Sequence, residues 1–395
     1  MHTFEKNITK LYWIYSFNST GFHLVVYTLF ILSKGFSMQQ FFLIEAAAVI
    51  VNVVTEIPTG IFSDRIGRKW SLLISSLIGI PACLFIIISS NFYVVLIAMS
   101  MGGIAISFSS GTDTAFLYDT LKALNREGEF NKVFGKMRWF GSWTGAIGGI
   151  IGGIIATYGL AYPWWAAFIV NFPILFITMT LREPPLSEES TADETKRFHL
   201  TESLKYSFKG ESGFFIIYAS VIWLFFSLGF WLWQPYLKLI SVPILYFGFF
   251  YATERLLSGF ASKYAFKIEG KIGISKSLLF IPLILALAFL LESRFAVIIG
   301  FLFIFLQSIS SGYFSPILAG YINSRIPSSR RATVLSTKNM LSSILFAILS
   351  PLLGFFIDIC SLQTALLLMG IILVIVSIIF YLLLKIKALE RPKQC

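Results

Sequence analysis

Charged residues are scarce in this chain of 395 residues. Asp, Glu, Lys and Arg make up 13% of it, hydrophobic residues make up 56%, and the mean hydropathy is +0.80. An ordinary soluble domain carries about twice this share of charged residues. The composition therefore excludes a soluble protein and predicts a membrane protein.

Cysteine and histidine are also scarce. The three cysteines lie far apart, and the histidines are His2, His23 and His199. So few ligands at such spacings exclude a disulfide framework and a zinc site. A Gly-Lys-Ser/Thr nucleotide loop is absent, and so is a Ser/His/Asp arrangement in the loops. We therefore predict no metal, no cofactor and no enzyme activity.

What the chain has instead is a series of long apolar runs. Each is about twenty residues long, the length of a helix that crosses the hydrocarbon core of a bilayer. The runs lack the alternating polarity of barrel strands, so their backbone groups must be satisfied within helices. We predict an all-α membrane protein with twelve transmembrane helices and no cleaved signal peptide. The predicted spans are 11–33, 39–62, 70–90, 93–120, 137–158, 162–181, 213–237, 243–264, 276–291, 295–322, 333–357 and 362–385.

Positive charge is distributed unevenly along the chain. The net charge is +11, and most of the 31 lysines and arginines fall in alternate connections between the spans. Only Lys34, Lys238 and Arg294 fall on the other side, and Arg255 lies within a span. By the positive-inside rule the basic side is cytoplasmic, and both termini lie there. The charge thus reports membrane topology and does not indicate nucleic-acid binding.

A polar stretch divides the chain into two halves with six spans each. We predict an N-terminal bundle over 1–181, a cytoplasmic central loop over 182–211 and a C-terminal bundle over 212–395. The halves share short patterns, because SFSSG at 107–111 is matched by SISSG at 308–312. Matching positions also carry Glu56, Gly60 and Asp64 in one half and Arg255, Gly259 and Lys263 in the other. This similarity indicates an internal two-fold repeat with inverted charges.

A charged stretch follows the second span, where residues 60–69 read GIFSDRIGRK. Its pattern of Gly, three residues, Asp-Arg, one residue and Gly-Arg-Lys resembles the signature of the major facilitator superfamily of secondary transporters. The matching residues are Gly60, Asp64, Arg65, Gly67, Arg68 and Lys69. The resemblance implies two pseudo-symmetric six-helix bundles, a substrate site near the midplane and alternating access. It also implies that the motif latches the outward-open state on the cytoplasmic side.

Each residue type of the motif suits a task. Gly67 allows a tight turn, and Gly60 allows a neighbouring helix to approach closely. Asp64 is expected to reach a helix N-terminus or a cation on the adjacent half. Arg65 and its basic neighbours are expected to contact anionic lipid and to pair across the halves. The alternative is that these charges only determine topology.

Carboxyl groups within spans are the candidates for proton coupling. Glu45, Asn52 and Glu56 share one face of helix two, and the sequence places Glu56 deeper than Glu45, which is expected near the outer end. The alternative for Glu56 is a fixed pair with a basic residue. Asp113 lies beside Ser110 in helix four and is the second candidate.

Helices one and eight add further titratable candidates. Thr20, His23 and Tyr27 lie on helix one, where a neutral, hydrogen-bonded histidine is the alternative to a proton-carrying one. Glu254 and Arg255 are adjacent on helix eight. We expect Arg255 to meet Glu56, its counterpart in the repeat.

The C-terminal half supplies the remaining candidates for the substrate cavity. Gln234 follows Trp231 and Trp233 in helix seven, and these tryptophans belong either to the interfacial belt, which is preferred, or to the cavity. The candidates in helix ten are Gln307, Ser311 and Tyr313. Helices three, nine and twelve have almost no polar residues in their interiors, and helix six has little beyond Asn171, so all four are expected to face lipid.

These observations predict a proton-coupled transporter of a small organic solute in a bacterial cytoplasmic membrane, functional as a monomer. Export of amphiphilic or drug-like compounds is preferred. Antiporters of this kind tend to carry an arginine in helix four and a Gly-Pro motif in helix five, and this chain lacks both. The alternatives are uptake of a nutrient by symport, a membrane receptor without transport, and a lipid-moving protein.

Overall fold

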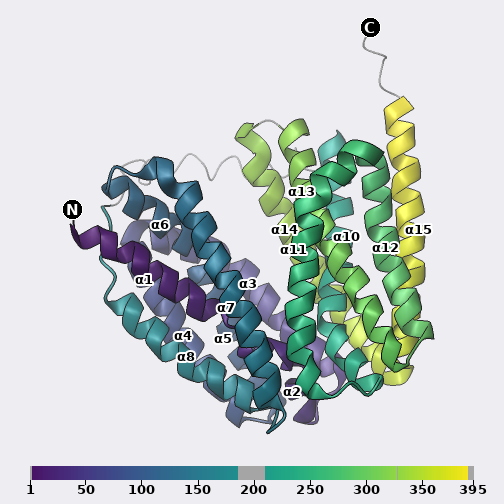
Figure 1. Ribbon diagram of the computed structural model, residues 1–395, viewed down its shortest axis with the longest axis horizontal. Coiled ribbons are helices and arrows are strands. Elements are labelled where there is room, and N and C mark those ends of the chain that lie inside the picture. The colour runs from purple at the N-terminus through teal and green to yellow at the C-terminus, as the bar shows by residue number, and fades with distance from the viewer. Residues whose placement is uncertain (1, 186–209, 327, 390–395) are drawn as a thin grey trace. The chain divides into compact units, whose positions relative to one another are not determined.

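The computed structural model describes residues 2–185, 210–326 and 328–389, and within these ranges it contains helices and no strands (Figure 1). The first half comprises α1 (His2–Ser19), η1 (Phe22–Val25), α2 (Tyr27–Ser33), α3 (Met38–Ile66), α4 (Arg68–Ile88), α5 (Phe92–Ser109), α6 (Thr112–Ala123), η2 (Glu127–Glu129), α7 (Phe130–Ala156) and α8 (Tyr162–Met179). The second half comprises α10 (Gly210–Leu239), α11 (Phe247–Ile272), α12 (Ile274–Arg294), α13 (Phe301–Arg325), α14 (Ser328–Ile359) and α15 (Leu362–Leu389).

Ten of the helical segments in the described ranges are long and apolar enough to cross a membrane. This confirms the prediction of an all-α membrane protein. The two other predicted spans are 11–33, which the structure divides among α1, η1 and α2, and 243–264, which falls on the more charged helix α11. The total of twelve crossings stays a prediction.

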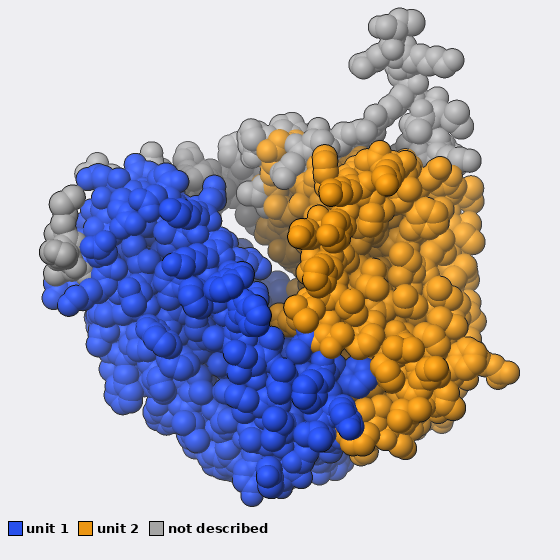
Figure 2. All heavy atoms as spheres, in the orientation of Figure 1, with its two compact units in different colours: residues 1–199, 244–252 blue, residues 200–243, 253–395 orange. Residues whose placement is uncertain are grey.

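The chain divides into two compact units (Figure 2). Unit 1 contains residues 1–199 and 244–252, and unit 2 contains residues 200–243 and 253–395. In unit 1 the helix pairs α3 with α5 and α4 with α5 pack along their lengths, and in unit 2 α12 packs beside α15 (Figure 1). Most of the predicted central loop, 182–211, lies outside the described residues.

Two predicted helices are interrupted at glycines. The span 11–33 breaks at Gly21, whose φ is 53°, and the span 93–120 breaks at Gly111, whose φ is 73°. Such positive φ values suit glycine, which lacks a Cβ atom. The repeated motif does not behave alike in the two units, because Gly312, the counterpart of Gly111, stays within helix α13. There it packs against the Ser258 carbonyl of α11.

The break in the first span allows close packing with α7. The carbonyl oxygens of Thr20 and Phe22 lie where Cβ atoms at Gly148 and Gly152 would be. These two positions of α7 must therefore be free of side chains for the backbones to touch. Gly148 and Gly152 thus serve close packing between helices.

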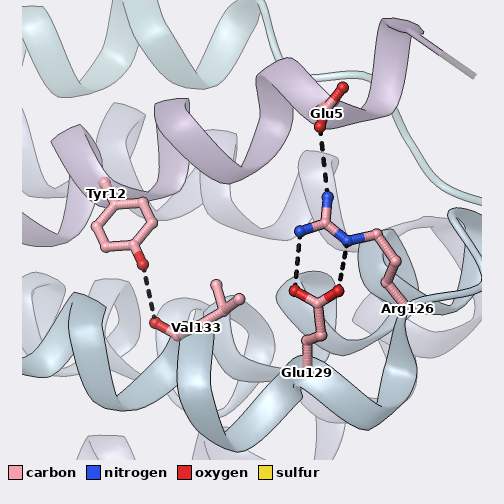
Figure 3. A network of polar contacts seen from close by, with 5 residues as sticks. All are labelled: Glu5, Tyr12, Arg126, Glu129 and Val133. Atoms are coloured by element: carbon pink, nitrogen blue, oxygen red, sulfur yellow. Dashed lines mark hydrogen bonds and ion pairs between the residues drawn. The ribbon is translucent and has the colours of Figure 1, made fainter.

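A polar network joins the other end of α1 to the start of α7 (Figure 3). The guanidinium of Arg126 donates to both carboxylate oxygens of Glu129, at 3.0 and 2.9 Å, and contacts Glu5 of α1 at 3.4 Å. The Tyr12 hydroxyl donates to the Val133 carbonyl at 3.1 Å. The ion pairs are exposed and contribute little stability, so their main effect is to orient the short helix η2 between the two longer helices.

We expect Gly148→Ala to destabilise the protein, because the added methyl group collides with the Thr20 carbonyl. Overpacking of this kind costs about 1–3 kcal/mol. The matched control is Gly135→Ala in the same helix, where nothing lies within 4 Å of the new Cβ atom. Thermal unfolding in detergent should show a lower Tm for the first variant and an unchanged or higher Tm for the second. Equal Tm values would contradict the packing argument.

Candidate transport site

A cavity of about 630 Å³ lies inside unit 1. Four predicted candidates line it, namely His23, Tyr27, Ser110 and Asp113. Much of its wall comes from small and polar residues of α4 and α5, including Ser75, Ser76, Gly79, Gly102 and Ala105. Helix three of the prediction corresponds to α4, which therefore borders a cavity in addition to the lipid that it is expected to face. Its serines and glycine give this helix a polar face that borders the cavity.

One end of the cavity is closed by apolar side chains. Leu11, Leu72, Met137 and Ile174 line the cavity and are also buried members of one hydrophobic cluster. They come from α1, α4, α7 and α8, so four helices meet at this end. Because Leu72 lies at the start of α4 and Ile86 near its end, the cavity follows α4 for about 20 Å.

The opposite end contains aromatic rings. The Trp164 ring centroid lies 4.7 Å from that of His23 and 5.1 Å from that of Tyr27. In the described part of the chain, neither Nδ1 of His23 nor Nε1 of Trp164 has a hydrogen-bond partner. Buried polar atoms without partners are uncommon, and at a cavity wall they mark positions where water or a bound solute can supply the bond.

Behind Tyr27 lies a buried carboxyl group. The Tyr27 hydroxyl donates to Oε1 of Glu45 at 2.6 Å, and the two residues are 8% and 6% exposed. Glu45 does not itself line the cavity, whereas Tyr27 does. The tyrosine hydroxyl therefore separates the carboxyl group from the cavity.

The start of α3 holds Glu45 in place. Ser37 and Gln40 form a capping box, in which the backbone N–H of each residue donates to the side chain of the other. The nearby ammonium group of Lys34 donates to the carbonyls of Ile87 and Ser89, at 3.0 and 2.9 Å. Among the described residues no ion pair to Glu45 is present, so its hydrogen-bond donor is a neutral hydroxyl.

The burial of the two glutamates on α3 is the reverse of the prediction. Glu45 was expected near the outer end, where it could be solvated, but it is buried, while Glu56 is exposed. Position along a helix does not determine burial, because the facing helices decide which side is covered. Asn52 donates to the Gly103 carbonyl at 3.2 Å, and Thr20 donates to the Phe17 carbonyl at 2.8 Å. Neither residue lines the cavity.

A second cavity, of about 360 Å³, lies inside unit 2. Trp231 and Trp233 line it together with Trp223, so the preferred assignment of these two residues to the interfacial belt is wrong. The predicted candidates Glu254, Gln307 and Ser311 also line this cavity.

Three other candidates of the C-terminal half do not line this cavity. Gln234 is fully buried, and the hydroxyl of Tyr313 lies 2.7 Å from that of Ser277. Arg255 is the third. Its pair with Glu56 would join the two units and stays a prediction.

Sequence reasoning missed Glu292 near the end of α12. It is 1% exposed, and its Oε1 accepts a hydrogen bond from Nε2 of Gln307 at 2.7 Å. Its place just beyond the predicted span 276–291 made it look like a solvated residue of a connecting segment. The signal available in the sequence was a single acidic residue following a long apolar run. Helix nine, which is expected to face lipid, thus also carries a buried carboxyl group.

In the charged motif of residues 60–69, Arg68 has its ion-pair partner within unit 1. Arg68 forms an ion pair with Asp119 of α6, with Nη1 and Oδ2 2.5 Å apart. Pairing of the basic residues across the halves stays a prediction. Lys69 lies over the ring of its neighbour Trp70, while Asp64 and Arg65 are exposed.

Glu183 occupies the N-terminus of α4. Its two carboxylate oxygens accept from the backbone N–H groups of Arg68 and Lys69, both at 2.8 Å. These are the first residues of α4, where unpaired N–H groups favour an anion. Burial raises the pKa of the Glu183 carboxyl, and the two N–H donors act in the opposite direction.

The two glycines of the motif differ. Gly67 joins α3 to α4 with a φ of 128°, and a Cβ atom there would lie 3.0 Å from the Glu183 carboxylate. In the described structure nothing lies within 4 Å of a Cβ atom at Gly60, so the close approach predicted there is not found. Gly103 provides one instead, since the Ala48 carbonyl of α3 lies against it.

Comparison with known proteins agrees with this architecture. The family model of the Major Facilitator Superfamily matches residues 11–297. The chain belongs to the major facilitator superfamily. It is accordingly a multi-pass membrane protein and a secondary transporter, and it is not an enzyme.

Individual relatives of this superfamily member are distant. YxaM, an MFS-type transporter of Bacillus subtilis (strain 168), is 24% identical over 349 residues, which cover 83% of this chain and 85% of YxaM. A crystal structure of the nucleoside transporter NupG matches with a TM-score of 0.79 at 13% identity, covering 98% of this chain and 100% of NupG. A D-xylose-proton symporter matches with a TM-score of 0.66 at 12% identity, covering 95% of this chain and 96% of the symporter. At such identities the two solved structures establish the fold alone.

We expect Glu183→Gln to lower the stability of this superfamily member, because the neutral amide replaces an anion at the α4 N-terminus with a weaker acceptor. The expected cost is about 1 kcal/mol. The control is Glu127→Gln, an exposed acidic residue of the same unit. Thermal unfolding should show a lower Tm for Glu183→Gln only, and an unchanged Tm in that variant would argue against the anion site.

Proposed function

We propose that this chain is a proton-coupled transporter of a small organic solute and that Glu45 carries the coupled proton. The observation that supports this most directly is the 2.6 Å hydrogen bond between Tyr27 and Glu45 beside the unit 1 cavity. An ionised carboxyl group within a membrane is costly unless it is paired, and transporters use such groups as proton relays. Glu45 has a hydroxyl partner that separates it from a cavity large enough for water and solute.

The pair offers a route for one proton. Tyr27 contacts both the cavity and the carboxyl group, so a proton that enters from cavity water reaches Glu45 by exchange at the hydroxyl. Solute in the cavity changes the hydration of this hydroxyl, which links solute binding to the protonation of Glu45. Asp113 lines the same cavity, and Glu56 lies on an exposed surface. These two residues are the competing candidates.

The solute that fits these surroundings is aromatic or amphiphilic. The cavities present tryptophan, tyrosine and phenylalanine rings with few charged groups. We propose that the chain exports such a compound. The relative from Bacillus subtilis favours a bacterial cytoplasmic membrane as its location. Uptake by symport is the second candidate, because a D-xylose-proton symporter and a nucleoside transporter share the fold. Alternating movement of the two halves, which the family implies, would carry the solute in either case.

Proton movement in inside-out membrane vesicles tests this proposal. The vesicles contain a pH-sensitive dye and have an acidic lumen, and ethidium, uridine or D-xylose is added outside. Export by antiport makes the lumen more alkaline, whereas symport makes it more acidic. We expect ethidium to raise the luminal pH with the natural chain. Glu45→Gln should abolish this change while exchange of labelled solute across the vesicle membrane continues.

Parallel variants distinguish the carboxyl groups. Tyr27→Phe should slow the proton movement at least tenfold, because the phenyl ring cannot accept or donate a proton. Glu127→Gln should behave like the natural chain. If proton movement persisted in Glu45→Gln and disappeared in Asp113→Asn or Glu56→Gln, the assignment to Glu45 would be wrong. A folded natural chain that moved no protons with any of the three compounds would count against the proposed function.

A further inference from the structure

The cavity of unit 2 is distinctive in what its polar groups can bind. Three of the polar side chains in its wall are hydroxyls, and each hydroxyl proton is already used. Ser227 donates to the Trp223 carbonyl at 2.9 Å, Ser308 to the Ile304 carbonyl at 3.5 Å, and Ser311 to the Ser308 carbonyl at 3.0 Å. The hydroxyl oxygens therefore face a ligand as acceptors only.

The amide of Gln307 is also oriented with its acceptor end toward the cavity. Its Nε2 donates to the buried carboxyl group of Glu292, at 2.7 Å, which fixes the donor end of the amide away from the cavity. The acceptor end, Oε1, lies against Gly229, where a Cβ atom would collide with it. Both Gly229 and Gln307 line the cavity. In the described part of the chain no donor reaches this oxygen, so it is available to a ligand.

Aromatic rings complete the wall. The cavity is lined by Trp223, Phe226, Phe230, Trp231 and Trp233, and Glu254 borders it as well. The tryptophans also bring indole N–H donors to this wall. One face of Trp223 is covered by the ammonium group of Lys338, which lies 4.8 Å from the ring centroid. Rings of this kind bind flat apolar surfaces by stacking.

We infer that the unit 2 cavity binds an aromatic compound that carries an N–H or O–H donor, and that Glu292 sets this preference by orienting Gln307. Glu292 does not line the cavity and so acts as a positioning residue. A ligand without a donor is poorly matched to the amide oxygen of Gln307 and to the serine oxygens, because each of these acceptors then loses its hydration without replacement. This inference rests on the proposal that the chain transports an organic solute, and it is independent of proton coupling at Glu45.

The test compares indole with 1-methylindole, which differ by the N–H donor. Binding is measured by titration in lipid nanodiscs with saturation-transfer difference NMR, with empty nanodiscs as the blank and without a pH gradient. We expect the natural chain to bind indole about tenfold more tightly than 1-methylindole. Trp231→Ala should weaken the binding of both compounds, which places them in this cavity.

Glu292→Gln tests the positioning role. Two facing amides can pair in either orientation, so Gln307 is no longer held with its oxygen toward the cavity. The preference for indole should fall from about tenfold to less than threefold, while the affinity for 1-methylindole stays the same. Glu127→Gln should keep the full preference. A general loss of structure would weaken both compounds alike and would not change their ratio.

Two results would overturn the inference. Equal affinities of the natural chain for the two compounds would show that the cavity does not select donors, and no binding of either would show that it does not take such compounds. This measurement uses the natural chain alone. A tenfold preference that persisted in Glu292→Gln would remove the role of Glu292. Because no proton gradient is involved, these outcomes are separate from failure of the vesicle experiment.

Discussion

Polar groups inside a hydrocarbon environment must find their partners within the protein, and this constraint accounts for most of the contacts described above. Hydroxyl side chains satisfy it by bonding to helix carbonyls. Ser71 donates to the Phe108 carbonyl at 2.7 Å and Ser75 to the Ala105 carbonyl at 2.6 Å, which joins α4 to α5. Lys34 satisfies it with two carbonyls at the end of α4. Once these bonds are made, few buried polar groups are left to serve a solute.

Those few groups are arranged alike in the two units. In each, a buried carboxyl group lies behind a neutral side chain that lines the cavity: Glu45 behind Tyr27, and Glu292 behind Gln307. In this arrangement the carboxyl group does not line the cavity, but it forms a hydrogen bond with the side chain that does. It does not follow from the sequence repeat, because the two carboxyl groups occupy helices that do not correspond.

Close helix packing gives these sites their shape. Glycines of α7 allow contact with the backbone of the broken first span, and Gly103 allows α3 to approach α5. Small residues thus bring some helices together, while bulky groups such as Met137 and Trp164 stand at the cavity wall. The same principle operates at Gly229, where a missing side chain leaves room for the amide oxygen of Gln307.

The sequence by itself determined the class of protein, the helical architecture and the family, because hydropathy over about twenty residues and the GIFSDRIGRK stretch are local features. It also pointed to His23, Tyr27, Asp113, Gln307 and Ser311, which the structure places at cavity walls. The sequence did not predict the helix interruptions, because a glycine in an apolar run adopts either a helical or a positive-φ conformation, and its tertiary contacts decide which. The burial of Glu45 over Glu56, the capture of the α4 N-terminus by Glu183 and the pairing of Glu292 with Gln307 were decided by the tertiary structure alone. Each depends on which residues distant in sequence face one another, and hydropathy along one chain does not contain that information.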